Sequence, residues 1–355
     1  MILQRYILRE LLGSFAFAFC TVLSICLIGT IFQVFRTFPS TGLEIVGKAL
    51  PMAIGTMATW VILVASCTSS TLVYARLAAE NEITAMRTCG IHVSRIIAPA
   101  VLLGLFLVGA AYPLNEIVVP WARMAQRMLF RESTLHLLRL PPPGAQDFKI
   151  GVWRITYTDY RDGRMLQPTI SRYQSHTLVM ECFASTGMIL AHDGPLRIVM
   201  TNPSGWEKDA KGQRQEMFRA GGDVTYEIPP EKPLDDSQRQ LVDQPSKQLW
   251  DKYFATRDPA VRNPILLILH TRYAASLAPM LLVLVAMPIG ILVRRGSRLA
   301  GLGAALPPLL IYFVCYFVFQ GLGDKNRVSP VLAAYAPDLF LGALGLSLLW
   351  GVARK

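Results

Sequence analysis

The chain has 355 residues, of which 52% are hydrophobic and only 17% are charged, and it carries a formal net charge of +11. Such a composition is typical of a membrane protein. The basic excess does not indicate nucleic-acid binding, because residues 120–262 carry 20 basic and 17 acidic side chains and most of the excess lies in the apolar segments and their short loops.

Three apolar segments in the first third of the chain are each long enough to cross a bilayer. Residues 11–35, 49–74 and 96–119 all exceed the ~20 residues that a helix needs to cross the hydrocarbon core. Arg5 and Arg9 precede the first segment, as in a signal peptide, but the segment is too long for one and no small-x-small cleavage site follows. We therefore expect a retained transmembrane helix.

The segment between the second and third spans is charged and helix-forming, and reads ARLAAENEITAMRTCGIHVSR at residues 76–95. Charged and apolar side chains share this predicted helix, so it can present both to a groove on another protein. An ordinary solvated loop helix that obeys the positive-inside rule would show the same pattern. The residues alone leave both interpretations open.

Residues 120–262 differ in composition from the rest of the chain and are numerous enough for a core of their own. Residues 121–138 predict a polar helix that continues the third span. Runs rich in β-branched and aromatic residues follow at residues 152–160, 176–185, 196–202 and 222–228. Turn signals separate them, among them RDG at residues 161–163 and HDG at residues 192–194. We expect a compact antiparallel β domain, sandwich-like or jelly-roll-like, closed by an amphipathic helix near residues 246–254.

No catalytic arrangement is recognisable in this segment. Its three histidines are scattered, and the sequence shows no HExxH motif and no Ser/His/Asp or Cys/His grouping of known spacing. The six cysteines show no CxxC pair, and only Cys182 lies in this segment, which excludes a disulfide framework. A GxxxxGK[ST] phosphate loop is also absent, so the sequence shows no recognisable site for ATP hydrolysis.

The last third of the chain contains three more predicted spans, at residues 265–293, 299–322 and 331–352. Ten Lys and Arg residues of the short loops fall on one side of the six spans, and only Arg36, Lys48, Lys325 and Arg327 fall on the other. Because basic loops stay in the cytoplasm, we expect both termini and residues 75–95 to be cytoplasmic. The expected fold is an α-helical membrane protein with six transmembrane helices (residues 1–119 and 263–355) and an inserted periplasmic antiparallel β domain (residues 120–262).

Four stretches carry a resemblance to a known family. They are MILQRYILREL at residues 1–11, AENEITAMRTCGI at 79–91, LHTRYAASLAPMLLVLVAMPIGILVRRGSRLAGLG at 269–303, and LAAYAPDLFLGALGL at 332–346. The third is the most specific, because the LHxR start, the central proline, the PxG end and the basic RRGSR loop occur in family order. The chain resembles, over essentially its full length, the LptF/LptG permeases of the ABC-type lipopolysaccharide exporter, and the first two stretches are slightly closer to LptF.

The resemblance implies that residues 75–92 form a coupling helix that docks into the ATPase subunit. Glu82 corresponds to the critical acidic contact of the family, and Gly90 to the glycine that ends the helix. The implied coupling residues are Arg76, Glu80, Glu82, Met86, Arg87 and Gly90.

The resemblance also implies that basic residues at the outer end of the first span hold phosphorylated lipid A. Relatives often place theirs deeper in the helix, where this chain has Thr30 and Gln33. His270 and Arg272, at the start of the fourth span, either bind anionic groups or snorkel to the interface. The candidate substrate residues are Arg36, Lys48, His270, Arg272, Tyr312 and Tyr316.

The inward-facing positions of the β strands are implied to accept acyl chains, although an ordinary closed core fits the same alternation. These positions are Ile155, Tyr157, Leu178, Met180, Ile198 and Met200.

The implied function is that of a permease subunit in the bacterial inner membrane, which extracts lipopolysaccharide and passes it to a periplasmic bridge. The implied partners are a second LptF/LptG-type permease, an LptB-like ATPase dimer that uses ATP, and LptC/LptA-like jellyroll proteins, with no cofactor bound by this chain. The alternatives are a membrane-anchored periplasmic sensor or enzyme, and a permease of another lipid or lipoprotein ABC system. A docking helix between the second and third spans disfavours the sensor, and an exported domain after the third span rather than the first disfavours lipoprotein release.

Overall fold

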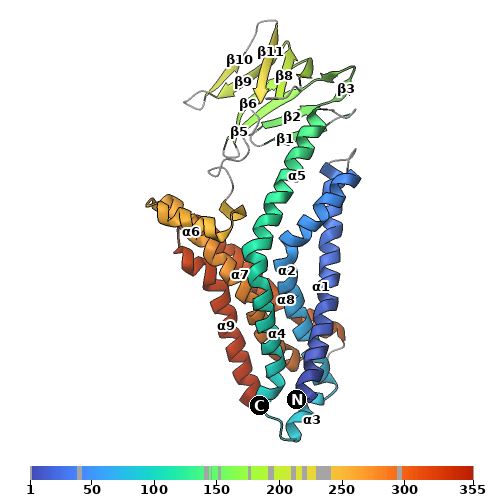
Figure 1. Ribbon diagram of the computed structural model, residues 1–355, viewed down its shortest axis with the longest axis vertical. Helices are drawn as coiled ribbons and strands as arrows, with labels where there is room; N and C mark the ends of the chain where they lie inside the picture. The colour runs from blue at the N-terminus through green and yellow to red at the C-terminus, as the bar shows by residue number, and fades with distance from the viewer. Residues whose placement is uncertain are drawn as a thin grey trace. The chain divides into compact units, whose positions relative to one another are not determined.

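The computed structural model describes most of the chain and divides it into two compact units. The described residues are 2–37, 42–139, 144, 146–150, 153–174, 177–190, 196–208, 213–217, 222–228, 241–293 and 298–354. The first unit, residues 1–37, 46–126 and 240–355, is helical, and the second, residues 38–45 and 127–239, contains the β strands (Figure 1).

The six predicted spans are confirmed as helices long and apolar enough to cross a membrane. The helices are longer than the apolar segments, because their polar ends continue the helical conformation. They are α1 (Ile2–Thr37), α2 (Gly42–Ala79), α4 (Val93–Pro113), α7 (Pro259–Leu292), α8 (Arg298–Asp324) and α9 (Pro330–Arg354).

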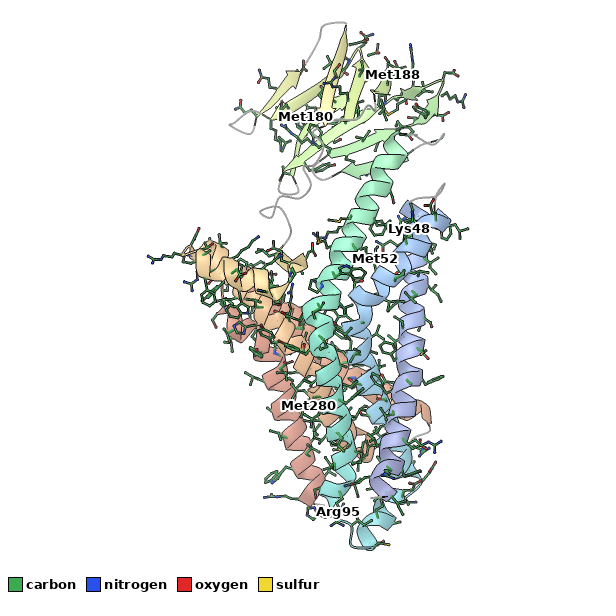
Figure 2. All side chains as sticks on the ribbon, viewed as in Figure 1. Lys48, Met52, Arg95, Met180, Met188 and Met280 are labelled. Carbon is green, nitrogen blue, oxygen red and sulfur yellow. The ribbon has the colours of Figure 1, made fainter. Side chains whose placement is uncertain are left out.

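Two glycines allow α7 and its neighbours to approach closely. A Cβ atom on Gly290 would lie 2.7 Å from the carbonyl oxygen of Thr71 and 3.0 Å from the backbone nitrogen of Ala75, so α7 touches the backbone of α2 here. A Cβ atom on Gly104 would lie 3.0 Å from the side chain of Met280, which lies among the helices in Figure 2. Small residues at these positions allow the van der Waals packing on which helix association in lipid depends.

The third span does not end where its apolar run ends. After α4 the chain forms a π-helical turn, η1 (Leu114–Val118), and then α5 (Val119–Arg139). The predicted polar continuation of the third span is therefore confirmed, with an added π turn. Such a turn widens the helix locally and re-aims the side chains that it carries, here Asn115 and Glu116.

The β unit consists of two antiparallel sheets, as predicted. The six-stranded sheet has the order β1 (Gln146–Ile150), β2 (Trp153–Tyr157), β5 (Thr169–Gln174), β6 (Thr177–Phe183), β9 (Ser204–Lys208), β10 (Arg214–Met217). The five-stranded sheet has the order β11 (Asp223–Ile228), β8 (Leu196–Thr201), β7 (Thr186–Leu190), β4 (Arg164–Leu166), β3 (Asp159–Arg161).

Two details of the predicted β domain are wrong. Residues 152–160 were expected to form one strand, but β2 ends at Tyr157 and β3 begins at Asp159 in the other sheet. The helix expected to close the β domain exists as α6 (Ser246–Ala255), but it packs on α7 and belongs to the helical unit, because its apolar residue Leu249 is buried against Ile265 and Leu269.

The turn at Asp162-Gly163 has positive φ at both residues, as a tight hairpin requires, and joins β3 to β4. The predicted turn at residues 192–194 and the basic loop at 294–297 lie outside the described residues.

Candidate functional site

The segment between the second and third spans is not one helix, contrary to the prediction. Helix α2 runs on to Ala79, Asn81 adopts a left-handed conformation with φ 58°, and a separate short helix, α3 (Glu82–Thr88), begins next to it. An asparagine tolerates this conformation better than most residues. Arg76 therefore belongs to α2, and the turn at Asn81 separates it from α3.

Gly90 ends α3, as the family resemblance implied. Its φ is +79°, its N–H donates to the carbonyl of Arg87, and the N–H of Ile91 donates to the carbonyl of Met86. This pair of hydrogen bonds is the Schellman motif, which favours glycine at the left-handed position. Ile91 also packs against the apolar cluster that contains Met86.

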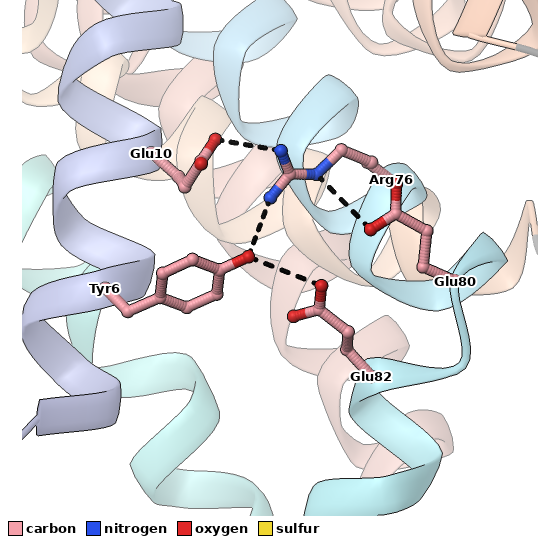
Figure 3. A network of polar contacts seen from close by, with 5 residues as sticks. All are labelled: Tyr6, Glu10, Arg76, Glu80 and Glu82. Carbon is pink, nitrogen blue, oxygen red and sulfur yellow. Dashed lines mark hydrogen bonds and ion pairs between the residues drawn. The ribbon is translucent and has the colours of Figure 1, made fainter.

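A polar network ties α3 to the first two spans (Figure 3). Arg76 forms an ion pair with Glu10 of α1 at 3.1 Å and donates a hydrogen bond of 3.1 Å to the hydroxyl of Tyr6. The Tyr6 hydroxyl in turn donates to the Glu82 carboxylate at 3.3 Å, and Glu80 lies 4.0 Å from Arg76. Tyr6 and Glu10 were not among the residues predicted from the sequence, although both lie in the first of the four family stretches.

The two faces of α3 differ in exposure. Ile83 and Met86 are buried in the apolar cluster shared with α1, α2, α4 and α7, so Met86 faces its own chain. The surface open to another protein is formed by Glu80, Asn81, Thr84, Ala85 and Thr88. Arg87 borders a cavity of about 330 Å³ lined by apolar residues of α3, α4, α7 and α9.

A second polar cluster lies at the π turn of the third span. The hydroxyl of Thr59 donates to Asn115 Oδ1 at 2.6 Å, and Asn115 Nδ2 donates to Ser276 Oγ at 3.0 Å. All three residues are buried. The cluster therefore joins α2, η1 and α7 inside the bundle, where each polar group has a partner as burial requires.

Arg272 is part of the same region and is 9% exposed. Its guanidinium donates to the carbonyls of Val242 and Gln244 at 2.8 and 2.7 Å and to Ser246 Oγ at 2.9 Å. The Ser246 hydroxyl donates onward to Glu116 at 2.6 Å. Through these three hydrogen bonds Arg272 fixes the start of α6 to α7, and Ser246 extends the connection to the π turn.

The other candidate substrate residues do not form one site with Arg272. His270 packs between the rings of Tyr273 and Tyr335, at 6.3 and 5.7 Å. Tyr312 is buried beside Tyr316, and Tyr316 lines a cavity of about 120 Å³ together with Arg272. Arg36 and Lys48 are exposed near the facing ends of α1 and α2.

The predicted inward-facing positions of the β strands are buried, with one exception. Ile155, Ile198 and Met200 are fully buried, and Tyr157 and Met180 are 3% exposed. Leu178 is only partly buried. These are the positions that the alternation predicted to face inward.

The pKa values of three polar groups in this unit depart from their usual values in the directions that burial and hydrogen bonding predict. Burial raises the pKa of the Cys182 thiol and of the Tyr226 hydroxyl, which donates to it at 3.3 Å. At the edge of the unit, two backbone N–H groups, from Gly144 and Tyr160, lower the pKa of the Asp159 carboxyl.

The described residues contain no group of three or more His, Cys, Asp or Glu side chains able to hold a metal ion.

Six membrane-spanning helices with a two-sheet β unit inserted after the third define the class of protein: a multi-pass membrane protein with a large extramembrane domain. The family model of the lipopolysaccharide export system permeases LptF/LptG matches residues 5–351, and the chain belongs to this family. Its members are permease subunits of an ABC transporter for lipopolysaccharide and are not enzymes in themselves. Among curated proteins, no significant match to the chain was found.

Proposed function

We propose that this chain is one permease subunit of an inner-membrane exporter, and that it extracts lipopolysaccharide laterally from the membrane and passes it to the β unit. Its proposed partners are a second LptF/LptG-type permease, an LptB-like ATPase dimer, which uses the ATP, and LptC/LptA-like jellyroll proteins that continue the periplasmic path. Family membership supports this proposal. The positive-inside rule supports an orientation with both termini and α3 in the cytoplasm and the β unit in the periplasm.

The observation that carries the coupling assignment is the geometry of the α3 segment. Helix α3 is bounded by the left-handed Asn81 and by Gly90, and its residues Ile83 and Met86 are buried in one apolar cluster with residues of α1 and α2, beside the polar network of Figure 3. A displacement of α3 by a bound ATPase would therefore act directly on two spans. The proposed contacts are Glu80, Glu82, Arg87 and the exposed face around Thr84.

For the substrate, the proposal relies on the exposed basic residues Arg36 and Lys48 as contacts for lipid A phosphates. His270, Tyr312 and Tyr316 are secondary candidates. Arg272 contributes less to this role, because its guanidinium already donates to two carbonyls and to Ser246.

A pair of substitutions tests whether Glu82 contacts the ATPase. We predict that Glu82→Lys, in the assembled complex, abolishes lipopolysaccharide export and that Glu82→Ala strongly impairs it, because truncating one member of a desolvated interfacial charge pair costs about 2–5 kcal/mol. Export into acceptor vesicles and recovery of the ATPase on copurification are the measurements. An Arg→Glu change in the ATPase groove should partly rescue the lysine variant.

The matched control is Tyr6→Phe, which removes the internal hydrogen bond to Glu82 and leaves the carboxylate in place. We expect it to export nearly as well as the wild type, since an exposed hydrogen bond contributes only about 0.5–1.5 kcal/mol. Equal defects in Tyr6→Phe and Glu82→Ala would assign Glu82 to the internal network instead. Normal export by Glu82→Lys would remove the coupling assignment.

A further inference from the structure

Helix α6 is attached to the first turns of the span α7. Residues 256–258 connect the two helices, Leu249 of α6 is fully buried against Ile265 and Leu269, and the indole N–H of Trp250 donates to the Tyr273 hydroxyl at 3.2 Å. Ser246 at the start of α6 accepts a hydrogen bond from Arg272, and Tyr253 near its end stacks with Arg262, so α6 runs antiparallel alongside the first turns of α7. The contacts therefore fix α6 at the level of residues 262–273.

This level corresponds to the membrane–water interface. Residues 273–292 of α7 contain no charged side chain, and at ~1.5 Å per residue they span about 30 Å, the thickness of the hydrocarbon core. The hydrocarbon thus begins near Tyr273, and the residues just before it, including His270 and Arg272, pass through the headgroup layer. Since α6 packs on these residues, it lies in the same layer.

The free surface of α6 has the side chains that this layer favours. Phe254 is 75% exposed and its ring stacks on that of Trp250 at 5.8 Å. Interfacial helices place Trp, Phe and Leu side chains at the boundary between headgroups and acyl chains. Exposure of the Phe254 ring to water is unfavourable, whereas contact with this interface is favourable.

Basic residues accompany the aromatic rings. Residues 246–262 contain four basic side chains against two acidic ones, and the carboxylate of Asp258 is occupied as the N-cap of α7, where it accepts from the Ala260 N–H at 2.9 Å. Lys247 and Arg257 are exposed, and Arg262 stacks over the Tyr253 ring at 4.2 Å. A short helix with an apolar edge and exposed cations is typical of an interfacial membrane helix.

We propose that α6 is an interfacial helix that binds the headgroup layer of anionic lipids at the N-terminal end of α7. Trp250 and Phe254 lie at the acyl boundary, and Lys247 and Arg257 contact lipid phosphates. The test measures lipid contact in a membrane without transport or ATPase, so it does not depend on the proposed function.

The position of α6 can be measured by fluorescence quenching in the full-length chain. A bimane probe on Phe254→Cys, in a chain whose six native cysteines are replaced, is placed in nanodiscs with lipids that carry a nitroxide near the headgroup or at the acyl-chain end. We expect the headgroup-proximal nitroxide to remove most of the fluorescence and the deep nitroxide to remove little. Probes on Asp162→Cys, in a β hairpin, and on Leu346→Cys, in α9, are the unquenched and deep controls.

The headgroup contact is tested by lipid charge. Phosphatidylglycerol in place of phosphatidylcholine should increase the quenching at position 254, and Lys247→Glu with Arg257→Glu should abolish this dependence, whereas Arg164→Glu in β4 should preserve it. Quenching by neither nitroxide would show that water or another protein covers α6. Such a result would overturn the proposal. Stronger quenching by the deep nitroxide would also overturn it, as would quenching in the unmodified helix that does not depend on lipid charge.

Discussion

Arg272 illustrates how a single charged residue is accommodated in a membrane span. An unpaired guanidinium in such a position is costly, so it is found with partners or at the interface. Here the carbonyls of Val242 and Gln244 and the hydroxyl of Ser246 surround it, and Ser246 passes the interaction to Glu116. The residue therefore stabilises the junction of α6, α7 and the π turn.

Replacing Arg272 should destabilise the folded protein. We predict that Arg272→Met lowers the free energy of unfolding by about 3 kcal/mol, because hydrogen bonds to a charged group contribute about 1.5–3 kcal/mol and the two carbonyls lose their donor. Thermal unfolding of the detergent-solubilised chain measures the effect. Arg257→Met, at an exposed position just beyond α6, is the control and should unfold as the wild type does. Equal stability of the two variants would contradict the bracing role.

At the scale of the element, the helices of the membrane unit pack through small residues. Gly290 of α7 faces the backbone of α2 between Thr71 and Ala75. The family motif that ends in this glycine thus has a packing explanation. Gly303 of α8 has open space around its Cα, with no atom within 4 Å of an added Cβ.

These two glycines make a matched pair. We predict that Gly290→Ala destabilises the protein by about 1–3 kcal/mol, because the backbone of α2 must move to admit the methyl group. Gly303→Ala should be neutral or slightly stabilising, since alanine favours a helix over glycine by about 1 kcal/mol. Unfolding midpoints of the two variants provide the comparison. A stabilised Gly290→Ala would show that α2 and α7 separate at no cost.

Tyr157 and Met180 are buried among the described strands of the β unit, whereas Asp162 is exposed in a turn. If the proposed lipid path is right, photocrosslinkers at Tyr157 or Met180 should capture lipopolysaccharide in the assembled exporter, and only with ATP. A crosslinker at the exposed turn residue Asp162 should capture little. Equal yields at the buried and exposed sites would assign the β unit a purely structural core.

At the scale of the whole molecule, the unequal distribution of basic residues predicts the orientation. We expect single cysteines at Asp162 and Asn326 to react with a membrane-impermeant maleimide from the periplasmic side of intact inner membrane. Cysteines at Ala79 and Thr88 should react only after permeabilisation. All four positions are exposed, so differences in labelling report the side of the membrane. Labelling of Ala79→Cys from outside would reverse the proposed topology.

The local properties of the chain were predictable from the sequence. The six spans follow from apolar runs of sufficient length, the hairpin at Asp162-Gly163 from its turn residues, and the end of α3 from Gly90. In each case the cause is local. A span forms because one apolar helix transfers favourably into lipid, and a turn or helix end forms where one glycine allows a positive φ.

Tertiary structure decided the partners of the polar groups. Tyr6 and Glu82 are 76 residues apart in sequence, and Asn115 and Ser276 are 161 apart, so no local pattern signals that they pair. The same holds for α6, whose apolar face fits a β domain or a neighbouring span equally well until packing against Ile265 and Leu269 selects the span. Sequence alone therefore determined which segments enter the membrane, whereas contacts between distant segments decided what Arg272, Glu82 and α6 bind, because burying a polar or apolar group is favourable only where a complementary surface meets it.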